Sequence, residues 1–282
     1  MKRLKVWWNK MEFSVLMPVC SKEKPEYLKE AIESIINQTV RTNQIVVVKD
    51  GELSKELNKI IEMYKNQYPE VIDILELKKQ NSLGMVLNEG IKVCKNSYIA
   101  RMDSDDIARK DRFEKQLKYL QEHPDIDVLG GYIEEYDQDM KKAKSSRKVP
   151  LTQKEIYERI IRQNPFNHST VMLKKESILE IGGYNDCPLE DYDLWIRMRL
   201  QNMKMANLPD VLVNYRTSSD MYKRRTGLEY LKGIIKIEKL LLENRLINIF
   251  QYLKNVIARI ILAFIPVKIK IFLYPKLIRK VK

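Results

Sequence analysis

The feature that most constrains this chain is a regular alternation of short apolar runs and helix-period segments in its first half. Strand-like runs cover 13–19, 45–48, 71–77 and 97–102, and helix-like segments cover 25–37, 53–68 and 83–94. Because parallel neighbouring strands need a long crossover, repeated strand–helix–strand units predict a parallel sheet with helices on both faces. The expected fold class is therefore α/β, with a mostly parallel central sheet.

The second half of the chain is less regular. We expect helices at 109–122, 152–163 and 190–200, strands at 127–132, 169–173 and 211–216, and a polar loop between 132 and 147. From Met221 onward the pattern is helical and changes character. The sequence therefore predicts a basic segment at 1–10, a main domain at 11–220 and a basic helical extension at 221–282.

The net charge of +13 belongs to the two ends of the chain. Residues 1–10 hold four basic side chains and 244–282 hold nine, with no acid in either segment, so the stretch 11–243 is formally neutral. A nucleic-acid binder usually carries its positive face on the folded domain, so we expect no nucleic-acid partner. The basic residues of 244–282 alternate with apolar ones, as in helices that lie on anionic membranes. A helical appendage packed on the domain would give the same pattern.

The expected location is the cytoplasm, peripherally on the inner face of the cell membrane. Three cysteines lie far apart, without the spacing of a disulfide framework or a zinc site, which fits a reducing compartment. No secretory signal is visible. The longest apolar run, 260–267, is much shorter than the ~20 residues that cross a bilayer.

Polar residues follow two of the predicted strands. Val48 leads into Lys49-Asp50-Gly51, and Met102 leads into Asp103-Ser104-Asp105-Asp106. Functional residues of such sheets lie just beyond the carboxyl ends of the strands. Clustered carboxylates repel each other, and Mg²⁺ or Mn²⁺ prefers their oxygens and bridges them to a substrate diphosphate. A solvated acidic turn that caps the next helix is the competing interpretation, whereas the glycine and glutamate of an EF-hand loop, a P-loop and a GxGxxG motif are absent.

A second group of acids opens the helix predicted at 190–200. Glu190 and Asp191 would be favoured there by the helix dipole in any protein, and the functional interpretation is a general base that deprotonates an attacking hydroxyl. His168 is a secondary candidate, because a lone histidine is more often structural than catalytic.

Four motifs in this order resemble family 2 of the inverting glycosyltransferases. They are SVLMPV at 14–19, VKDG at 48–51, RMDSDD at 101–106 and EDYDLW at 190–195, and the resemblance covers roughly 11–216. The stretch NPFNHST at 164–170 resembles the bacterial capsule and exopolysaccharide subgroup. Two departures affect the nucleotide pocket: Lys49-Asp50 stands where many relatives have two acids, and Cys20-Ser21 stands where relatives often have Tyr-Asn.

The resemblance implies a GT-A fold, which is a Rossmann-like single domain, and it implies roles for the matching residues. Asp191 would be the catalytic base, with Glu190, His168 and Asp106 as secondary candidates. Asp103 and Asp105 would hold Mn²⁺ or Mg²⁺ as a DxD motif. The predicted contacts of the nucleotide-sugar are Pro18, Val19, Asp50, Gly84, Asn88, Arg101, Asp103 and Ser104. A helix cap explains Gly84 and Asn88 equally well.

The implied reaction transfers a sugar, with inversion, from a nucleotide-sugar to a glycan or lipid-linked acceptor in bacterial surface polysaccharide synthesis. UDP is the expected carrier by family analogy. The alternatives are a sugar-phosphate nucleotidyltransferase and a non-catalytic nucleotide-sugar-binding protein of the same fold. The first needs a glycine-rich loop after the first strand, but 20–26 contains no glycine, and the intact acids argue against the second.

Overall fold

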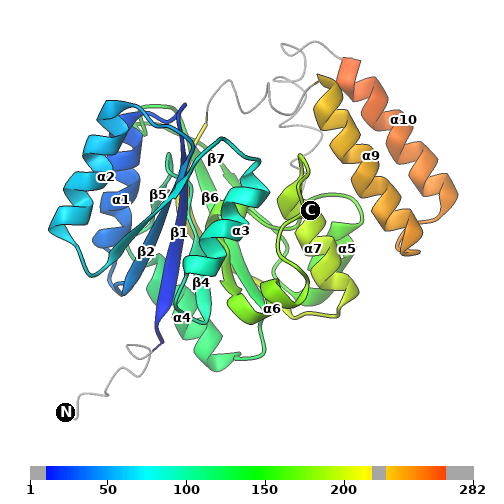
Figure 1. Cartoon of the computed structure of the whole chain (residues 1–282). Coiled ribbons are helices and arrows are strands. Elements are labelled where there is room, and N and C mark those ends of the chain that lie inside the picture. Colours follow the sequence, from blue (N-terminus) through cyan, green and yellow to red (C-terminus); the bar gives the residue numbers. More distant parts are fainter. Residues whose placement is uncertain (1–10, 218–226, 265–282) are drawn as a thin grey trace.

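A computed structural model describes residues 11–217 and 227–264, which form a central sheet with helices on both faces (Figure 1). In this part of the chain the sheet runs in the order β3-β2-β1-β4-β8-β6-β9-β5, and β7 pairs with β6 beside this path. The strands are β1 (Phe13–Cys20), β2 (Gln44–Asp50), β3 (Ile72–Leu77), β4 (Tyr98–Arg101), β5 (Ile107–Ala108), β6 (Val128–Tyr136), β7 (Ala143–Arg147), β8 (Met172–Lys174) and β9 (Met205–Arg216).

Helices cover the sheet in two groups, and each group closes its own apolar core. The helices are α1 (Pro25–Ile36), α2 (Lys55–Gln67), α3 (Leu83–Val93), α4 (Arg112–Glu122), α5 (Gln153–Ile160), α6 (Lys175–Glu180), α7 (Glu190–Leu200), α9 (Gly227–Glu243) and α10 (Ile249–Phe264). Successive strand residues point to opposite faces, so Val15 and Met17 join the core with α1, α2 and α4. Leu16 joins the other core, which α3, α5, α6, α7 and α9 close. Burial on both faces explains why the central strands are continuous apolar runs in the sequence.

The first four strands run parallel, as the alternation predicts. β1 is parallel to both β2 and β4, and β2 is parallel to β3, so these strands end at one edge of the sheet. Beyond β4 the sheet is mixed, because β8 is antiparallel to β4 and β6 whereas β9 is parallel to β6. The α/β fold with flanking helices and a C-terminal helical extension is confirmed, and the continuous run of parallel neighbours is β1–β4.

Three predicted elements differ from the structure. The strand expected at 211–216 is the end of a longer strand, β9, which begins at Met205. The expected polar loop between 132 and 147 is largely an antiparallel pair, because β6 continues to Tyr136 and β7 follows. Its polar side chains hid the strand pattern; Ser145, for example, donates to Glu135 across the pair at 2.6 Å. The strand expected at 169–173 begins only at Met172, because the preceding residues form the 3₁₀ helix His168–Thr170. There the Thr170 hydroxyl donates to the Asn167 backbone oxygen at 2.7 Å, a local bond that competes with strand pairing.

The C-terminal helices α9 and α10 form a hairpin at one end of the molecule (Figure 1). Ile237 and Leu241 of α9 enter the core shared with α7, and Gly233 lets α9 approach Pro188 closely. No helix of the described residues is both long and apolar enough to span a membrane. The predicted division at 1–10, 11–220 and 221–282 stays a prediction, and residues 1–10, 218–226 and 265–282 lie outside the described part.

Candidate active site

A small pocket opens where β1, β2 and β4 end at the same edge of the sheet. It has a volume of about 130 Å³ and is lined by Pro18, Val19, Cys20, Glu23, Asp50, Val86, Asp103, Ser104 and Asp105. Five of the residues predicted to contact a nucleotide-sugar are therefore brought together here, although they come from three separate stretches of chain. The other three, Gly84, Asn88 and Arg101, are not among the lining residues.

Asp50 ends β2 at the pocket wall. Its Oδ1 accepts a hydrogen bond from the backbone N–H of Asn81 at 2.8 Å, which fixes the carboxylate. The next residue, Gly51, has a φ of +75°, and a side chain there would lie 3.0 Å from the backbone nitrogen of Gln80. Only glycine adopts this turn without strain, so the turn that sets Asp50 beside the pocket depends on it.

The three aspartates after β4 converge. One carboxylate oxygen from each of Asp103, Asp105 and Asp106 lies within 4.8 Å of the other two. Burial, together with the charges of Asp103 and Glu23, raises the pKa of Asp105 to about 7. Burial and the neighbouring aspartates also raise the pKa of Asp106, and its Oδ2 has no hydrogen-bond partner among the described residues. Crowded carboxylates of this kind suit a divalent cation, which takes oxygen ligands and removes the repulsion.

Two buried arginines hold this acidic turn from its strand side. Arg101, the last residue of β4, forms an ion pair with Oδ2 of Asp103 at 2.5 Å. Burial alone would lower the pKa of Arg101, but the charge of Asp103 raises it. Arg112 of α4 donates to the backbone oxygen of Arg101 at 2.8 Å, and burial lowers the pKa of Arg112 to about 9. Arg101 is thus engaged by the DxD motif, and its predicted contact with the nucleotide-sugar stays a prediction.

Ser104 and Glu23 connect the acidic turn to the loop after β1. The hydroxyl of Ser104 donates to Oε2 of Glu23 at 2.6 Å, and Ser104 is buried. Glu23 was not predicted as a site residue. It lies between the first strand and α1, where the departure Cys20-Ser21 left the rim of the pocket undefined by sequence.

Arg216, the last residue of β9, is a site residue that sequence reasoning missed. Its backbone N–H donates to Oδ1 of Asp106 at 2.9 Å, and its Nε donates to the backbone oxygen of Asp105 at 2.8 Å. The guanidinium also pairs with Glu30 at 2.5 Å and stacks on the ring of Tyr27 at 3.8 Å. Arg216 therefore ties the acidic turn to β9 and α1, and its position at the end of a predicted strand was the available signal.

Asp191 lies in the first turn of α7, and hydrogen-bond donors hold both of its oxygens. Oδ1 accepts the backbone N–H of Tyr192 at 2.8 Å, and Oδ2 accepts Nδ2 of Asn164 at 2.5 Å. The amide of Asn164 has a defined orientation because its own oxygen accepts the N–H of Phe166 at 3.1 Å. Donors to the charged form and the positive end of a helix both favour an ionised carboxylate. Sequence reasoning did not single out Asn164, although it opens the 164–170 motif.

Glu190 precedes Asp191 but lies in an environment that favours its proton. Burial and then the charge of Asp191 raise the pKa of Glu190 to about 8. Its pKa is also lowered by Arg101 and raised by Asp103, so Glu190 is close enough to the DxD motif to respond to its charges. Glu190, although far from the DxD motif in the sequence, is therefore near enough to feel its charge, whereas neither Glu190 nor Asp191 is among the residues that line the pocket.

Helix α3 positions the loop that precedes α7. Asn88 bonds the backbone of Tyr184 twice, accepting its N–H and donating to its oxygen, both at 2.8 Å. A side chain at Gly183, whose φ is +74°, would come within 2.4 Å of the Asn88 amide oxygen. A side chain at Gly84 would lie 2.8 Å from the backbone oxygen of Asn185. Gly84 and Asn88 thus hold this loop, and their contact with a nucleotide-sugar stays a prediction.

His168 belongs to a buried aromatic group. Its Nε2 lies 2.9 Å from the hydroxyl of Tyr184, and its ring meets that of Trp195 edge-on at 6.0 Å. Burial and then the charge of Arg101 lower the pKa of His168 well below its usual value, so the ring is neutral. These contacts are those of a structural histidine, and a catalytic role for it stays a prediction.

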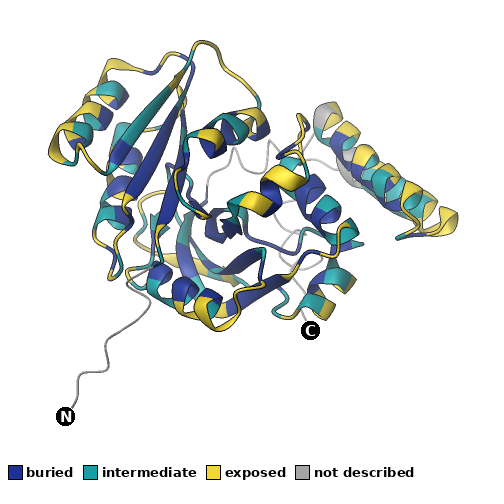
Figure 2. Cartoon of the chain, turned by 60° about the horizontal axis from the view of Figure 1, so that its bottom comes forward, coloured by how far each residue is buried: buried dark blue, intermediate teal, exposed yellow. Residues whose placement is uncertain are grey.

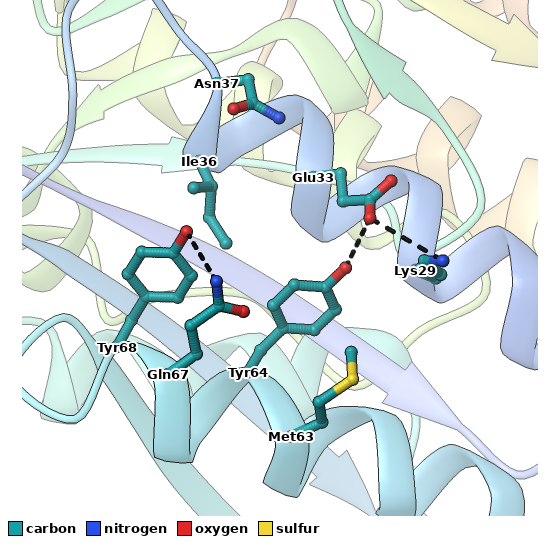
Figure 3. A pocket seen from close by; sticks show the side chains of 8 residues that line it. All are labelled: Lys29, Glu33, Ile36, Asn37, Met63, Tyr64, Gln67 and Tyr68. Atoms are coloured by element: carbon teal, nitrogen blue, oxygen red, sulfur yellow. Dashed lines mark hydrogen bonds and ion pairs between the residues drawn. The ribbon is translucent and has the colours of Figure 1, made fainter.

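A larger hollow of about 290 Å³ lies between α1 and α2 (Figure 3). Its carboxylate is already engaged, because Glu33 accepts the hydroxyl of Tyr64 at 2.7 Å and lies 4.0 Å from Lys29. This hollow reaches Ile36 and Asn37 at the C-terminal end of α1. The pocket with the aspartates is lined instead by Cys20 and Glu23, which precede α1 in the chain. The chemistry of the site therefore belongs to the smaller pocket.

Comparison with known proteins relates this arrangement to sugar transfer. The model of the family described as "Glycosyl transferase family 2" matches residues 14–182. The chain is 36% identical over 265 residues to the amylovoran biosynthesis glycosyltransferase AmsE of Erwinia amylovora, which covers 94% of this chain and 98% of that protein. It is 33% identical over 270 residues to an Escherichia coli UDP-Gal:alpha-D-GlcNAc-diphosphoundecaprenol beta-1,3-galactosyltransferase, which covers 95% and 97%.

Solved structures support the fold. TarS 1–349 of S. aureus in complex with UDP-GlcNAc matches with a TM-score of 0.64 at 18% identity, over 96% of this chain and 76% of that one. The mannosyltransferase PcManGT of Pyrobaculum calidifontis, in complex with GDP-Man and Mn²⁺, matches with a TM-score of 0.61 at 12% identity, over 95% and 81%. At these identities the likeness establishes a shared fold.

Proposed function

The chain belongs to glycosyltransferase family 2, and we propose that it transfers a sugar with inversion from a UDP-sugar to a lipid-linked glycan in bacterial surface polysaccharide synthesis. The observation that carries this proposal is the convergence of three aspartates beside the pocket at the ends of β1 and β2, with Glu190 near enough to respond to the charge of Asp103. The E. coli relative has a UDP-linked donor and a diphosphoundecaprenol-linked acceptor in its name, which supports these substrate classes. The nucleotidyltransferase alternative loses its basis, because the family and the relatives named above are glycosyltransferases.

The aspartates after β4 fit a divalent metal ion. They offer hard oxygen ligands within 4.8 Å of one another, and the fully buried Asp106 keeps one oxygen without a partner among the described residues. Mn²⁺ or Mg²⁺ prefers such ligands. We assign Asp103 and Asp105 as ligands, with Asp106 as the secondary candidate. A bound cation would supply the positive charge that stabilises the leaving nucleoside diphosphate.

The donor's nucleotide would occupy the pocket at the ends of β1 and β2. Pro18 and Val19 provide its apolar wall, and Asp50 presents a carboxylate that Asn81 holds in place. A fixed carboxylate recognises N–H or hydroxyl donors of a base or a ribose, because it only accepts hydrogen bonds when ionised. Lys49 is turned to Glu76, with which it forms an ion pair, so the base contact at this strand end rests on Asp50 alone.

We assign Asp191 as the general base. The donors from Tyr192 and Asn164 and the start of α7 favour the ionised carboxylate, which is the state that accepts a proton from the acceptor hydroxyl. Glu190, with a pKa of about 8, keeps its proton near neutral pH and so presents a hydrogen-bond donor beside it. Neighbouring acids with opposite protonation states divide the roles of base and donor. Attack by the deprotonated hydroxyl on the face opposite the leaving group inverts the anomeric centre.

A lipid-linked acceptor would bring the enzyme to the cytoplasmic face of a membrane. We therefore place the protein peripherally on that surface, with the C-terminal helices nearest to the lipid. The basic residues of 244–282, which outnumber the acids nine to none, favour an anionic surface.

A panel of nucleotide-sugars tests the proposed donor. Hydrolysis of each donor would be measured with Mn²⁺, with Mg²⁺ and with chelator, and binding would be followed by thermal shift with UDP, GDP and dTDP. We expect UDP-sugars to be hydrolysed in the presence of metal and UDP with Mn²⁺ to stabilise the fold. Preference for GDP or dTDP would refute the UDP assignment, and unchanged hydrolysis in chelator would refute the metal assignment.

A further inference from the structure

Helix α10 presents a row of large apolar side chains to solvent. Phe250 is 79% exposed, Ile257 is 57%, Leu253 and Ile249 are 48% each, and Ile260 is 37%. These residues recur every three or four positions, so they form one continuous stripe along the helix. Figure 2 shows α10 at the outer side of the hairpin with much of its length exposed. Soluble surfaces carry single exposed apolar residues, but a contiguous row marks a docking surface.

The opposite side of α10 is the one that packs on α9. Tyr252, Asn255, Val256 and Arg259 are half-buried, and Asn255 donates to Oε2 of Glu238 on α9 at 2.9 Å. The exposed stripe is therefore not the contact between the two helices. Within the described residues no element covers it.

Helix α9 adds exposed lysines to the hairpin. Lys232, Lys236 and Lys239 are exposed at intervals of four and three residues, and Lys239 lies 3.5 Å from Glu243. Because α9 turns Gly233, Ile237 and Leu241 to the domain, helical periodicity directs the lysines away from it. α10 lies antiparallel beside α9, and Glu238 faces it. Given that contact, helical periodicity places the lysines of α9 and the apolar stripe of α10 on the same face of the hairpin.

We propose that this outward side of the α9–α10 hairpin docks on an anionic lipid bilayer, with the apolar stripe in the headgroup region and the lysines at the phosphates. An amphipathic helix with adjoining basic residues binds such a surface through burial of its apolar area and through attraction of its positive charges to anionic lipids. Charge favours lipid over a protein partner, because 244–282 carries nine basic residues and no acid. The hairpin thereby becomes the part of the chain that meets the membrane first.

Docking of this hairpin bears on the catalytic site through a direct contact. A side chain at Gly233 of α9 would lie 3.2 Å from Pro188 and 3.6 Å from Leu189, the two residues that precede Glu190 and Asp191. The membrane-facing element is therefore packed against the start of the helix that carries the assigned base. This step alone rests on the proposed function, since it matters only for an acceptor held in the membrane.

Vesicle flotation of the full chain tests the proposal without donor or acceptor. The probes are vesicles of phosphatidylcholine alone and of phosphatidylcholine with phosphatidylglycerol. The first variant is Phe250→Ser with Leu253→Ser and Ile257→Ser, and the second is Lys232→Glu with Lys236→Glu and Lys239→Glu. We expect the first to lose roughly tenfold or more of its binding to anionic vesicles, and the second to lose the preference for phosphatidylglycerol.

Matched controls replace exposed residues of the same types elsewhere: Met63→Ser with Leu179→Ser, and Lys55→Glu with Lys59→Glu. They should bind vesicles as the unchanged chain does, and a cooperative thermal unfolding transition near that of the unchanged chain verifies that every variant is folded. Unchanged flotation of both hairpin variants would overturn the proposal, and so would vesicle binding lost only when Lys268, Lys270 and Lys276 are replaced by Glu. A dimer that the apolar variant converts to monomer, with vesicle binding intact, would identify the surface as a contact between two copies.

Discussion

The two acid groups of the site differ in how the chain treats their charge. Asp103, Asp105 and Asp106 are crowded together, and the pKa values of Asp105 and Asp106 are raised by burial and mutual repulsion. Asp191, by contrast, receives one donor on each oxygen. In the first group Arg101 pairs with Asp103, but the raised pKa values of Asp105 and Asp106 show that their mutual repulsion is not compensated, whereas both oxygens of Asp191 have hydrogen-bond donors. The same residue type therefore suits two different roles: the crowded aspartates suit binding of a cation, and Asp191 suits accepting a proton.

The contacts that hold the two groups also differ. The turn that carries the crowded aspartates is held partly through its backbone, by Arg112 on the Arg101 oxygen and by Arg216 on the Asp105 oxygen. Arg101 also pairs with Oδ2 of Asp103, and the N–H of Arg216 bonds Oδ1 of Asp106, which leaves Oδ2 of Asp106 without a partner among the described residues. Asp191 is held through its side chain, by the amide of Asn164.

The largest expected effect comes from removing the base. Asp191→Asn keeps the shape of the side chain but cannot take a proton, so turnover should fall by about 10³-fold. Donor binding, measured by titration of UDP in Mn²⁺, should be nearly unchanged because the crowded aspartates are intact. Asp186→Asn, on an exposed acid of the same loop, is the matched control and should leave turnover unchanged. Normal turnover of Asp191→Asn would contradict the assignment of Asp191 as the base and, with it, the difference between the two acid groups.

Removing a metal ligand should have the next largest effect, and it should change the binding of UDP rather than turnover. Asp105→Ala should weaken Mn²⁺-dependent binding of UDP by roughly 10- to 100-fold, because one of the converging oxygens is lost. Isothermal titration with and without Mn²⁺ measures it. Asp125→Ala, at an exposed acid after α4, should bind as the unchanged chain does. Equal loss of UDP binding in metal and in chelator would mean that Asp105 contacts the nucleotide directly.

A smaller effect is expected at the residue that orients the base. Asn164→Ala removes the donor to Oδ2 of Asp191 and should lower kcat by roughly tenfold, with little change in UDP binding. The acid limb of the pH–rate profile should also move to higher pH, because the carboxylate loses a hydrogen bond to its charged form. A purely structural role would lower kcat without moving the profile, and that result would exclude positioning of the base.

The last effect concerns stability rather than activity and sharpens the assignment of Glu190. Its pKa rises from 4.5 to about 8 on folding, so the folded chain holds this proton more tightly than the unfolded chain. The resulting stabilisation is complete below about pH 4.5 and is lost as the pH rises through 8. Glu190→Gln should therefore match the unchanged chain at low pH and exceed its free energy of unfolding by roughly 4–5 kcal/mol at pH 9, because each pKa unit corresponds to about 1.4 kcal/mol. Urea titrations measure this, with Glu176→Gln, an exposed acid, as the control; equal pH dependence in chain and variant would contradict it.

The sequence predicted the first half of the fold better than the second for a physical reason. Strands buried on both faces, such as β1 and β2, leave continuous apolar runs, and the acids after β4 stand at a strand end where function is expected. β7 carries polar residues after Ala143 and lies at the sheet margin, so it gives no such signal. The strand expected at 169–173 failed because the Thr170 hydroxyl bonds to its own turn.

The partners of the site residues were harder to predict than the residues themselves. Motif spacing pointed to Asp105 and Asp191, but Arg216 reaches Asp105 from the end of β9 and Asn164 reaches Asp191 from the loop after α5, both far away in the sequence. The reach of Asn88 to Tyr184 likewise depends on how α3 packs against the loop before α7. Such contacts follow from tertiary packing, which one sequence does not specify.

Diffraction from crystals grown with Mn²⁺ and a non-hydrolysable UDP-sugar would test the central claim most directly. The claim predicts an anomalous manganese peak bonded to oxygens of Asp103 or Asp105 and to the diphosphate. It also predicts that the carboxylate of Asp191 faces the anomeric carbon from the side opposite the leaving group. Manganese bound elsewhere, or Asp191 turned away from the sugar, would contradict the account.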